Sequence, residues 1–361
     1  MGFAAHGLAA LLGVLAAGPA LAQTALGDRP PNSARVDPAR VDTARVDTAR
    51  VDTGPIWTFR VENDKLTTLP LGSDKYYTSG LQIGWTSAPG AVPPALARLS
   101  AALWGDGTQR IGFSLGQQIF TPIDTSRVNP NPRDRPNAGY LAGTLSLLHD
   151  AGLRDGLDVR STLALSSGVI GPGALGRQVQ NGFHTLIGVS TNRGWRYQLG
   201  NEPAIELLGQ RVWRVGLGTL GGLESDLLPS LTAGVGSVRD YVQGGVLLRV
   251  GRGLRQDFGP GRIGSGLDGG DAYQSADELG WYLFGGADGQ AVARDAFLDG
   301  NLFSTSRYVA KKFLVGEMVA GVGVIWRGVR FSYTQTWRTE EFRGQKGGLF
   351  NFGSLAASAR F

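Results

Sequence analysis

The sequence predicts an all-β protein, a transmembrane antiparallel β-barrel of about 12 strands. Three observations lead to this prediction. Apolar and polar residues alternate with a period of two, for example in segments 57–61, 81–85 and 329–337. The chain begins with an export signal, and no later run of 18 or more apolar residues could form a spanning helix. It ends on an alternating segment whose last residue is the aromatic Phe361.

Residues 1–22 have the features of a secretory signal peptide. An apolar run covers residues 8–17, and Ala20-Leu21-Ala22 fits the small-x-small cleavage pattern. The amino end lacks the usual Lys or Arg, and the run is too short to cross a bilayer. We therefore expect an exported protein whose mature chain begins near Gln23.

Residues 23–55 are predicted to form a low-complexity tether. Between residues 32 and 54 the chain repeats Ala-Arg-Val-Asp-Thr, so arginine and aspartate alternate and their charges balance. Such a segment has little to bury and no net charge with which to bind an acidic surface. We expect it to lie outside the folded domain.

Residues 56–361 are predicted to be the barrel domain. Glycine makes up 56 of the 361 residues, and the chain has no cysteine, which excludes disulfides and thiolate metal sites. No basic cluster with interleaved aromatics indicates nucleic-acid binding. Apolar and polar residues also alternate in the strands of a soluble β-sandwich. The predicted export, the strand length and the aromatic residue at the C-terminus favour a closed barrel in a membrane instead. The strands are expected to start near Ile56, Tyr77, Arg110, Gly139, Leu157, Pro203, Pro229, Tyr241, Gly280, Gly316, Gly328 and Phe350.

Residues 172–188 break the alternation and predict a short helix near the outer rim of the barrel. Leu175, Val179 and Phe183 recur at helical spacing, and Gln180 and His184 fall on the other face. The chain has three histidines. Because His6 lies in the leader and His149 at a strand edge, His184 is the leading candidate for acid–base chemistry. The alternative is a surface histidine on a helix that merely covers the barrel.

Glu62-Asn63-Asp64 closes the first predicted strand, and Thr78 lies at the start of the second. A hairpin would bring a carboxylate, an amide and a hydroxyl together at one rim. If the tether is periplasmic, this rim faces the outer leaflet. Such hard oxygen ligands suit Ca²⁺. The alternative is ordinary turn chemistry, because Asn and Asp are common where strands end.

Two familiar patterns are rejected. Residues 112–116 match the Gly-x-Ser-x-Gly elbow around Ser114, but they lie inside an alternating strand with no helix after it. Residues 216–221 match the Gly-x-Gly-x-x-Gly pattern of dinucleotide-binding proteins, but only in residue types. A glycine-rich loop of an exported barrel explains them more simply.

The order of short motifs over residues 56–361 resembles that of the lipid A 3′-O-deacylase (LpxR-type) outer-membrane family. The resemblance implies a twelve-stranded barrel in the bacterial outer membrane. It also implies Ca²⁺-dependent removal of the 3′-linked acyloxyacyl chain from lipid A of lipopolysaccharide. The matching motifs are Glu62-Asn63-Asp64, Tyr77-Thr78-Ser79-Gly80, residues 116–122, residues 134–139, the His184 helix, Gly194-Trp195, Asn201-Glu202-Pro203, residues 257–260 and residues 298–301.

The resemblance also implies roles for particular residues. It assigns catalysis to His184, Asn63 and Thr78, with His184 as the base that activates water. It places Ca²⁺ at Asp64, and Glu202 is our candidate for a further acidic ligand. Arg135 and Arg133 are candidates for binding the phosphates of the lipid. The barrel-assembly machinery would be a partner during biogenesis. A non-enzymatic barrel, either a pore or a structural protein, and a serine-dependent outer-membrane phospholipase remain as alternatives.

Overall fold

The computed structural model describes residues 2–17, 54–67, 76–154, 156–264, 267–275 and 278–361. Within them the alternating segments form twelve strands, as predicted. The strands are β1 (Ile56–Asn63), β2 (Tyr76–Thr86), β3 (Thr108–Thr121), β4 (Ala138–Arg154), β5 (Leu157–Ile170), β6 (Glu202–Leu220), β7 (Leu223–Gly236), β8 (Arg239–Arg252), β9 (Gly280–Asp295), β10 (Leu314–Trp326), β11 (Val329–Arg338) and β12 (Phe350–Arg360).

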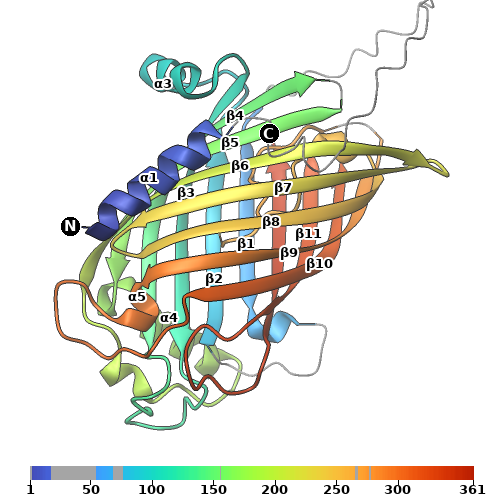
Figure 1. Cartoon of the computed structure of the whole chain (residues 1–361). Helices are drawn as coiled ribbons and strands as arrows, with labels where there is room; N and C mark the ends of the chain where they lie inside the picture. The colour runs from blue at the N-terminus through green and yellow to red at the C-terminus, as the bar shows by residue number, and fades with distance from the viewer. Residues whose placement is uncertain (1, 18–53, 68–75, 155, 265–266, 276–277) are drawn as a thin grey trace, which may run out of the picture.

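The strands close into one antiparallel barrel, in which each strand pairs with its neighbours in sequence and β1 pairs with β12 (Figure 1). The register pairs Ile56 with Arg360 at one rim and Asn63 with Gly353 toward the other. We call the first the terminal rim, because β1 starts and β12 ends there. We call the second the α4 rim, because it carries helix α4 (Gly176–Leu186). The predicted fold class is confirmed.

The predicted starts agree with the structure to within two residues for every strand except the seventh. β7 begins at Leu223, six residues before the predicted Pro229, because β6 runs on to Leu220 and the pair is joined by a tight turn. Gly221 and Gly222 make this turn with φ of +59° and +79°, which glycine adopts without strain. Residues 216–221, which resemble a dinucleotide fingerprint, therefore form a strand end and its hairpin turn.

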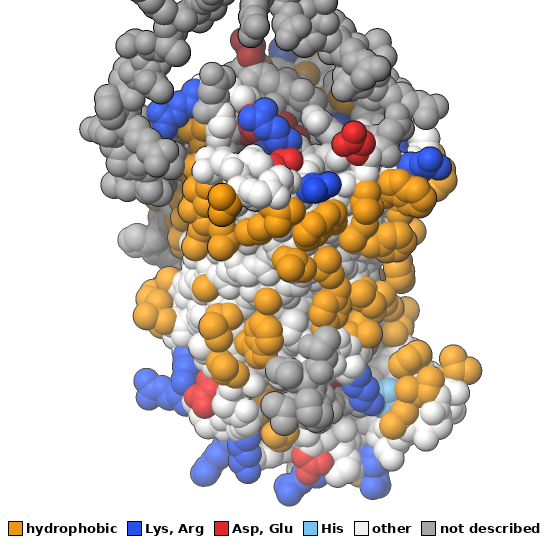
Figure 2. Space-filling model, turned by 90° about the vertical axis from the view of Figure 1, so that its right-hand side faces the viewer, with side chains coloured by type: hydrophobic (Ala, Val, Ile, Leu, Met, Phe, Trp, Pro, Cys, Tyr) orange, Lys and Arg blue, Asp and Glu red, His pale blue; other side chains and the backbone are white. Residues whose placement is uncertain are grey.

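The two faces of the barrel wall follow the alternation. Outward-facing side chains such as Phe59, Ile83 and Phe113 are exposed, and Figure 2 shows hydrophobic side chains gathered across the middle of the face in view. Inward-facing side chains such as Arg60 and Glu62 are buried and polar. This is the arrangement of a membrane barrel, in which lipid meets the apolar face.

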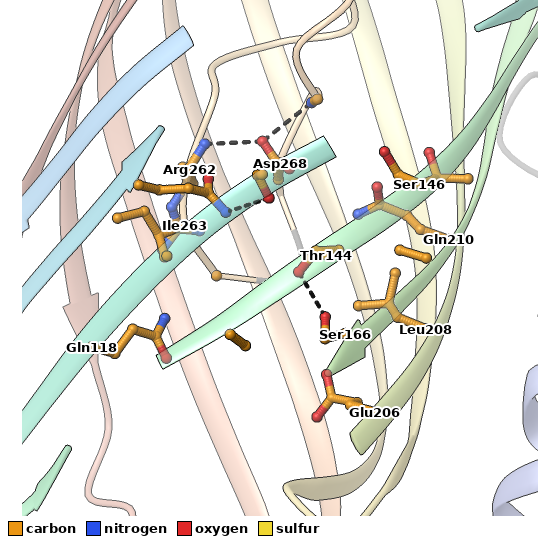
Figure 3. A pocket seen from close by; sticks show the side chains of 18 of the residues that line it. Gln118, Thr144, Ser146, Ser166, Glu206, Leu208, Gln210, Arg262, Ile263 and Asp268 are labelled. Atoms are coloured by element: carbon orange, nitrogen blue, oxygen red, sulfur yellow. Dashed lines mark hydrogen bonds between the residues drawn. The ribbon is translucent and has the colours of Figure 1, made fainter. Parts of the chain in front are cut away.

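The lumen is filled by described residues of the segment between β8 and β9, which we call the luminal segment (residues 253–275). It includes η4 (Leu254–Gln256). Figure 3 shows Arg262, Ile263 and Asp268 inside the ring of strands, beside a cavity of about 240 Å³. The segment is bound to inward-facing side chains: Arg262 donates to Glu317 (3.1 Å), the Ile263 N–H donates to Glu62 (3.0 Å), and Arg160 donates to the Gly269 carbonyl (2.7 Å).

An apolar cluster packs across the barrel at the α4 rim. It joins rings from β2, β3 and β12 with the short helix α5 (Ala296–Asp299). Phe297 of α5 stacks on Phe120 with ring centroids 4.1 Å apart. The lumen is therefore occupied from both ends, by the luminal segment and by this cluster.

The remaining helices lie outside the barrel wall. Helix α1 (Gly2–Ala16) packs across the outside of β6 and β7, where Leu11 and Leu15 contact Gly209 (Figure 1). Helix α3 (Pro94–Trp104) follows β2 at the terminal rim. No described helix is long and apolar enough to cross a membrane. The signal peptide stays a prediction, and most of the predicted tether lies outside the described residues.

Candidate functional site

The hairpin of β1 and β2 brings the predicted oxygen ligands together at the α4 rim. Asn63 pairs with Ser79, next to Thr78, and Asp64 begins the 3₁₀ helix η1 (Asp64–Leu66) directly after β1. The Asn63 side chain accepts a hydrogen bond from the Lys65 N–H (2.7 Å), which fixes the turn. The Asp64 side chain is only 1% exposed. The structure therefore places Asn63, Asp64 and Thr78 in one cluster.

A β-bulge aims Thr78 outward. The register between β2 and β3 shifts between Tyr77 and Ser79, so Thr78 is the extra residue. Its hydroxyl lies 2.6 Å from that of Thr121. Thr121 has the same parity on β3 as the exposed Phe113 and Leu115, so it belongs to the outer face of the wall. The Thr78 hydroxyl therefore lies on the outside of the barrel, although it is buried there.

Helix α4 packs against this outer face, on β3 and β4. The outward-facing Gln117 donates to the carbonyl of Ala174 (2.6 Å), in the turn η2 (Pro172–Ala174) that precedes the helix. Gly176 allows close packing, because a Cβ there would lie 2.8 Å from the Trp195 ring and 3.1 Å from the Gly139 backbone. The predicted helix over residues 172–188 is confirmed, and it lies on the wall rather than over the lumen.

The amphipathic pattern of α4 is inverted relative to a helix that covers an apolar core. Its buried residues are Gly176, Gln180 and His184, which share one face at four-residue spacing. Its apolar stripe is exposed, and Phe183 at 56% is typical of it. The helix therefore turns its imidazole toward the barrel and its hydrophobic side chains away from the protein.

A backbone carbonyl orients the imidazole of His184. Its Nδ1 lies 2.7 Å from the carbonyl oxygen of Ser190, and the whole side chain is only 5% exposed. A carbonyl can only accept, so Nδ1 carries the hydrogen in the neutral ring and Nε2 carries the lone pair. This is the tautomer that a general base needs, with one nitrogen as the donor and the other as the acceptor.

Buried amides fix α4 to the loop that follows it. Gln180 accepts hydrogen bonds from the indole N–H of Trp195 (2.9 Å) and from the Asn192 amide (3.2 Å). Asn192 also donates to Asn137 at the start of β4 (2.7 Å). Asn181 exchanges hydrogen bonds with the Asn192 backbone at 2.9 and 3.0 Å. These bonds hold the helix in one orientation, and His184 with it.

The two arginines predicted to bind phosphate have different surroundings. Arg135 is buried, donates to Glu341 (2.9 Å) and lies over the Phe120 ring. Burial disfavours ionisation of Glu341, but Arg135 and Arg338 outweigh it and lower the pKa of this carboxyl. Arg133 is exposed on the loop between β3 and β4. Arg135 is thus already paired within the protein, and the substrate-binding role stays a prediction for both.

Glu202 forms its hydrogen bonds with the segment that follows α5. It begins β6, and its carboxylate accepts hydrogen bonds from the backbone N–H groups of Leu302 (2.8 Å) and Phe303 (3.3 Å). These contacts tie the segment after α5 to the wall. No hydrogen bond recorded for Glu202 reaches Asn63, Asp64 or Thr78 in the described residues, so its role as a metal ligand stays a prediction without geometric support.

The donor chemistry around Asp64 fits a hard cation. The buried carboxylate of Asp64 lies at the same hairpin end as the Asn63 amide and the Thr78 hydroxyl, and the chain has no cysteine. Among the described residues, no three histidine, aspartate or glutamate side chains gather as a metal site. A cation here would take Asp64 together with neutral oxygens and water, and Ca²⁺ accepts such mixed, irregular shells.

The structure also confirms that the rejected elbow is part of a strand. Ser114 lies in the middle of β3, faces the lumen and accepts a hydrogen bond from Gln82 (3.2 Å). His149 lies within β4, buried, with Nε2 3.2 Å from the Gly105 carbonyl oxygen at the terminal rim. Neither residue is near the Asp64 cluster.

Sequence reasoning missed two residues that support the cluster. Thr121 places the Thr78 hydroxyl, and Glu62 holds the strand ends on either side. Glu62 accepts hydrogen bonds from Tyr77 (2.8 Å) and Ser354 (2.8 Å) as well as from the luminal segment. The position of Glu62 next to Asn63 could have indicated a role in the site. Its partners, however, lie up to 292 residues away, and the sequence alone does not reveal them.

Comparisons with known proteins bear on the family and the fold. A family model described as "Outer membrane protein LpxR" matches residues 8–361. The fold is similar to that of LpxR from Salmonella typhimurium, with a TM-score of 0.69, 21% identity, and coverage of 85% of this chain and 100% of that one. The β domain of the Bordetella autotransporter BrkA matches more weakly, with a TM-score of 0.43, 12% identity, and coverage of 86% and 99%. No curated protein sequence matches. The chain belongs to the LpxR family of outer membrane proteins, the lipid A deacylase family that its motifs resemble.

Proposed function

We propose that this protein hydrolyses the 3′-linked acyloxyacyl ester of lipid A in the outer membrane. The observation that carries the proposal is the position of the site. The bulge turns Thr78 to the outer face of the wall, and α4 holds His184 against that same face. The candidate residues Thr78 and His184 thus lie on the outer face of the wall, which suits a substrate that is itself a membrane lipid.

In the proposed reaction, His184 Nε2 takes a proton from a water molecule as the water oxygen attacks the ester carbonyl carbon. The proton then passes to the sugar oxygen as the C–O bond breaks, which leaves a free hydroxyl and a fatty acid. Asn63 and Thr78 orient the water and the ester at the strand ends. Ca²⁺ bound by Asp64 would supply positive charge to stabilise the negative charge that develops on the ester oxygen.

The two alternatives are less well supported. A pore needs an open lumen, but the luminal segment and the apolar cluster at the α4 rim occupy the barrel from both ends. A serine hydrolase needs an activated serine, and Ser114 faces the lumen with Gln82 as its neighbour rather than a histidine. The barrel-assembly machinery remains our proposal for the partner that inserts this barrel.

The exposed stripe of α4 fits a helix that lies in the outer leaflet. We predict that Phe183→Ser lowers deacylation of lipid A in vesicles by about tenfold, because one buried aromatic side chain contributes roughly 1.5–3 kcal/mol. Deacylation of lipid A in detergent micelles should change much less, since a micelle adapts to the altered surface. Initial rates with the two substrates would measure this difference.

Leu220→Ser is the matched control for the stripe. Leu220 is 88% exposed at the β6–β7 turn, on the terminal rim, so its replacement should leave both rates unchanged. Equal rates for Phe183→Ser and wild type in vesicles would show that the stripe does not contact the leaflet.

Mass spectrometry of lipid A from cells with and without the protein tests the proposed function. We expect a new species that has lost the 3′-linked acyloxyacyl group. The Ser114→Ala variant should produce the same species, because Ser114 lies away from the site. An unchanged lipid A spectrum with folded protein in the membrane would favour a non-enzymatic barrel. Loss of activity in Ser114→Ala would favour a serine hydrolase.

A further inference from the structure

A groove beside α4 is lined by three arginines that the proposed reaction does not use. Arg177 comes from α4, and Arg193 and Arg196 come from the loop and the 3₁₀ helix η3 (Gly194–Tyr197) that follow it. The groove has a volume of about 780 Å³. Its other polar lining consists of hydroxyl and amide side chains, and no carboxylate is among the described residues that line it. Its side chains are therefore rich in hydrogen-bond donors and positive charge.

These arginines differ from others at the same rim in having no acidic partner among the described residues. Arg127 pairs with Asp124 at 2.8 Å, Arg135 pairs with Glu341 at 2.9 Å, and Arg338 pairs with both Glu317 and Glu341. All three groove arginines are exposed. Three guanidinium groups that share one groove repel one another, so an anion that bridges them is favoured.

The backbone that carries these arginines is fixed before any ligand binds. Trp195, between Arg193 and Arg196, is buried and donates to Gln180 of α4 (2.9 Å). The Arg193 N–H donates to the Thr125 carbonyl on a different loop (3.0 Å). Gly194 lets this segment approach its neighbours, because a Cβ there would lie 2.5 Å from the Pro130 ring. The positions of the three charges are therefore set by the fold, which reduces the entropy lost on binding.

The groove also has a definite relation to the candidate active site. Around the axis of α4, the buried face of Gln180 and His184 lies between the exposed stripe of Phe183 on one side and Arg177 with Asn181 on the other. The apolar stripe and the cationic groove thus lie on opposite sides of the face that carries the imidazole. This order matches an amphiphile with acyl chains at one end and anionic groups at the other.

We propose that Arg177, Arg193 and Arg196 bind the phosphate groups of the phosphorylated sugar headgroup of the substrate. This inference rests on the proposed function for the identity of the lipid. It places headgroup recognition in the groove and not at Arg135, whose charge is already neutralised by Glu341. Arginine suits this role because its planar fork matches phosphate oxygens.

Binding of lipid A to inactive protein tests the inference without relying on activity. The His184→Asn protein, with and without Arg177→Gln, Arg193→Gln and Arg196→Gln together, would be titrated with lipid A in detergent micelles at low salt. We expect the arginine replacements to weaken binding of phosphorylated lipid A by about tenfold to a hundredfold. Binding of lipid A from which the phosphates have been removed should not change.

Arg127→Gln is the matched control, because Arg127 is exposed at the same rim but already paired. It should leave both affinities unchanged. An equal loss for the two lipids, or no loss for either, would overturn the proposal. Binding of inorganic phosphate as tight as that of lipid A would assign the groove to free phosphate instead of a headgroup. If wild-type protein fails to deacylate lipid A yet shows the phosphate-dependent binding, the groove stands and the proposed reaction fails.

Discussion

Replacing His184 by asparagine is expected to lower the rate of lipid A deacylation by about two to four orders of magnitude, the usual contribution of a positioned base. Asparagine can still offer a donor near the Ser190 carbonyl, so α4 should keep its position. It cannot accept a proton from water at neutral pH. Single-turnover rates on purified protein, with heat-modifiable gel mobility as the measure of folding, would give the loss.

His149→Asn is the matched control for this prediction. His149 is also buried and also contacts a backbone carbonyl, but it lies at the terminal rim. Its replacement should not change the rate per folded molecule. If His184→Asn stays close to wild-type activity, the proposed water activation is wrong, and another group in the Asp64 cluster must supply the base.

Chelation of divalent cations is expected to abolish deacylation, and Ca²⁺ should restore it better than Mg²⁺. Mg²⁺ requires near-ideal octahedral geometry, whereas Ca²⁺ tolerates an irregular shell in which Asp64 would be joined by neutral oxygens. The measurement is the initial rate in excess chelator, followed by titration with each metal. Full activity in excess chelator would remove the metal from the mechanism.

The Asp64→Asn variant tests whether Asp64 binds the cation on which deacylation is expected to depend. It keeps the shape of the side chain but removes the negative charge, so we expect the Ca²⁺ concentration for half-maximal activity to rise steeply. Glu202→Gln is the comparison, because Glu202 is bound to the N–H groups of Leu302 and Phe303 and not to the cluster. If the Ca²⁺ concentration for half-maximal activity rose more in Glu202→Gln than in Asp64→Asn, Glu202 would be the more important metal ligand.

The position of the site gives the barrel an unusual role. The lumen of this protein is a packed interior with buried ion pairs such as Arg249 with Asp226 (2.6 Å) and Arg262 with Glu317 (3.1 Å). Inward-facing charges therefore stiffen the wall rather than line a channel. In our proposal the chemistry takes place on the other side of that wall, beside a short helix and two strand ends. The barrel would then act as a rigid support that presents the site to the leaflet.

The sequence by itself determined the fold class, the family and most strand positions. Alternation with a period of two arises because successive side chains of a strand point to opposite faces. It is therefore visible in the sequence of each strand by itself. The seventh strand start was missed because Glu224, Ser225 and Asp226 are all polar, so the sequence shows no alternation there. Their luminal contacts come from other parts of the chain: Asp226 pairs with Arg249, and Glu224 accepts hydrogen bonds from the luminal segment. The short helix could be predicted in the same way, since its apolar residues recur at three- and four-residue spacing and not at every second residue.

Only the tertiary structure decided which way the functional side chains point. The bulge at Thr78 exists because two strands fail to stay in register, and one strand alone does not reveal this. The apolar stripe of α4 predicts an amphipathic helix but not that the stripe faces away from the protein. Arg135 resembles a phosphate ligand in sequence, yet Glu341, 206 residues later, neutralises it, whereas Arg177, Arg193 and Arg196 have no such partner among the described residues. These differences depend on contacts between distant residues, and such contacts form only when the barrel closes.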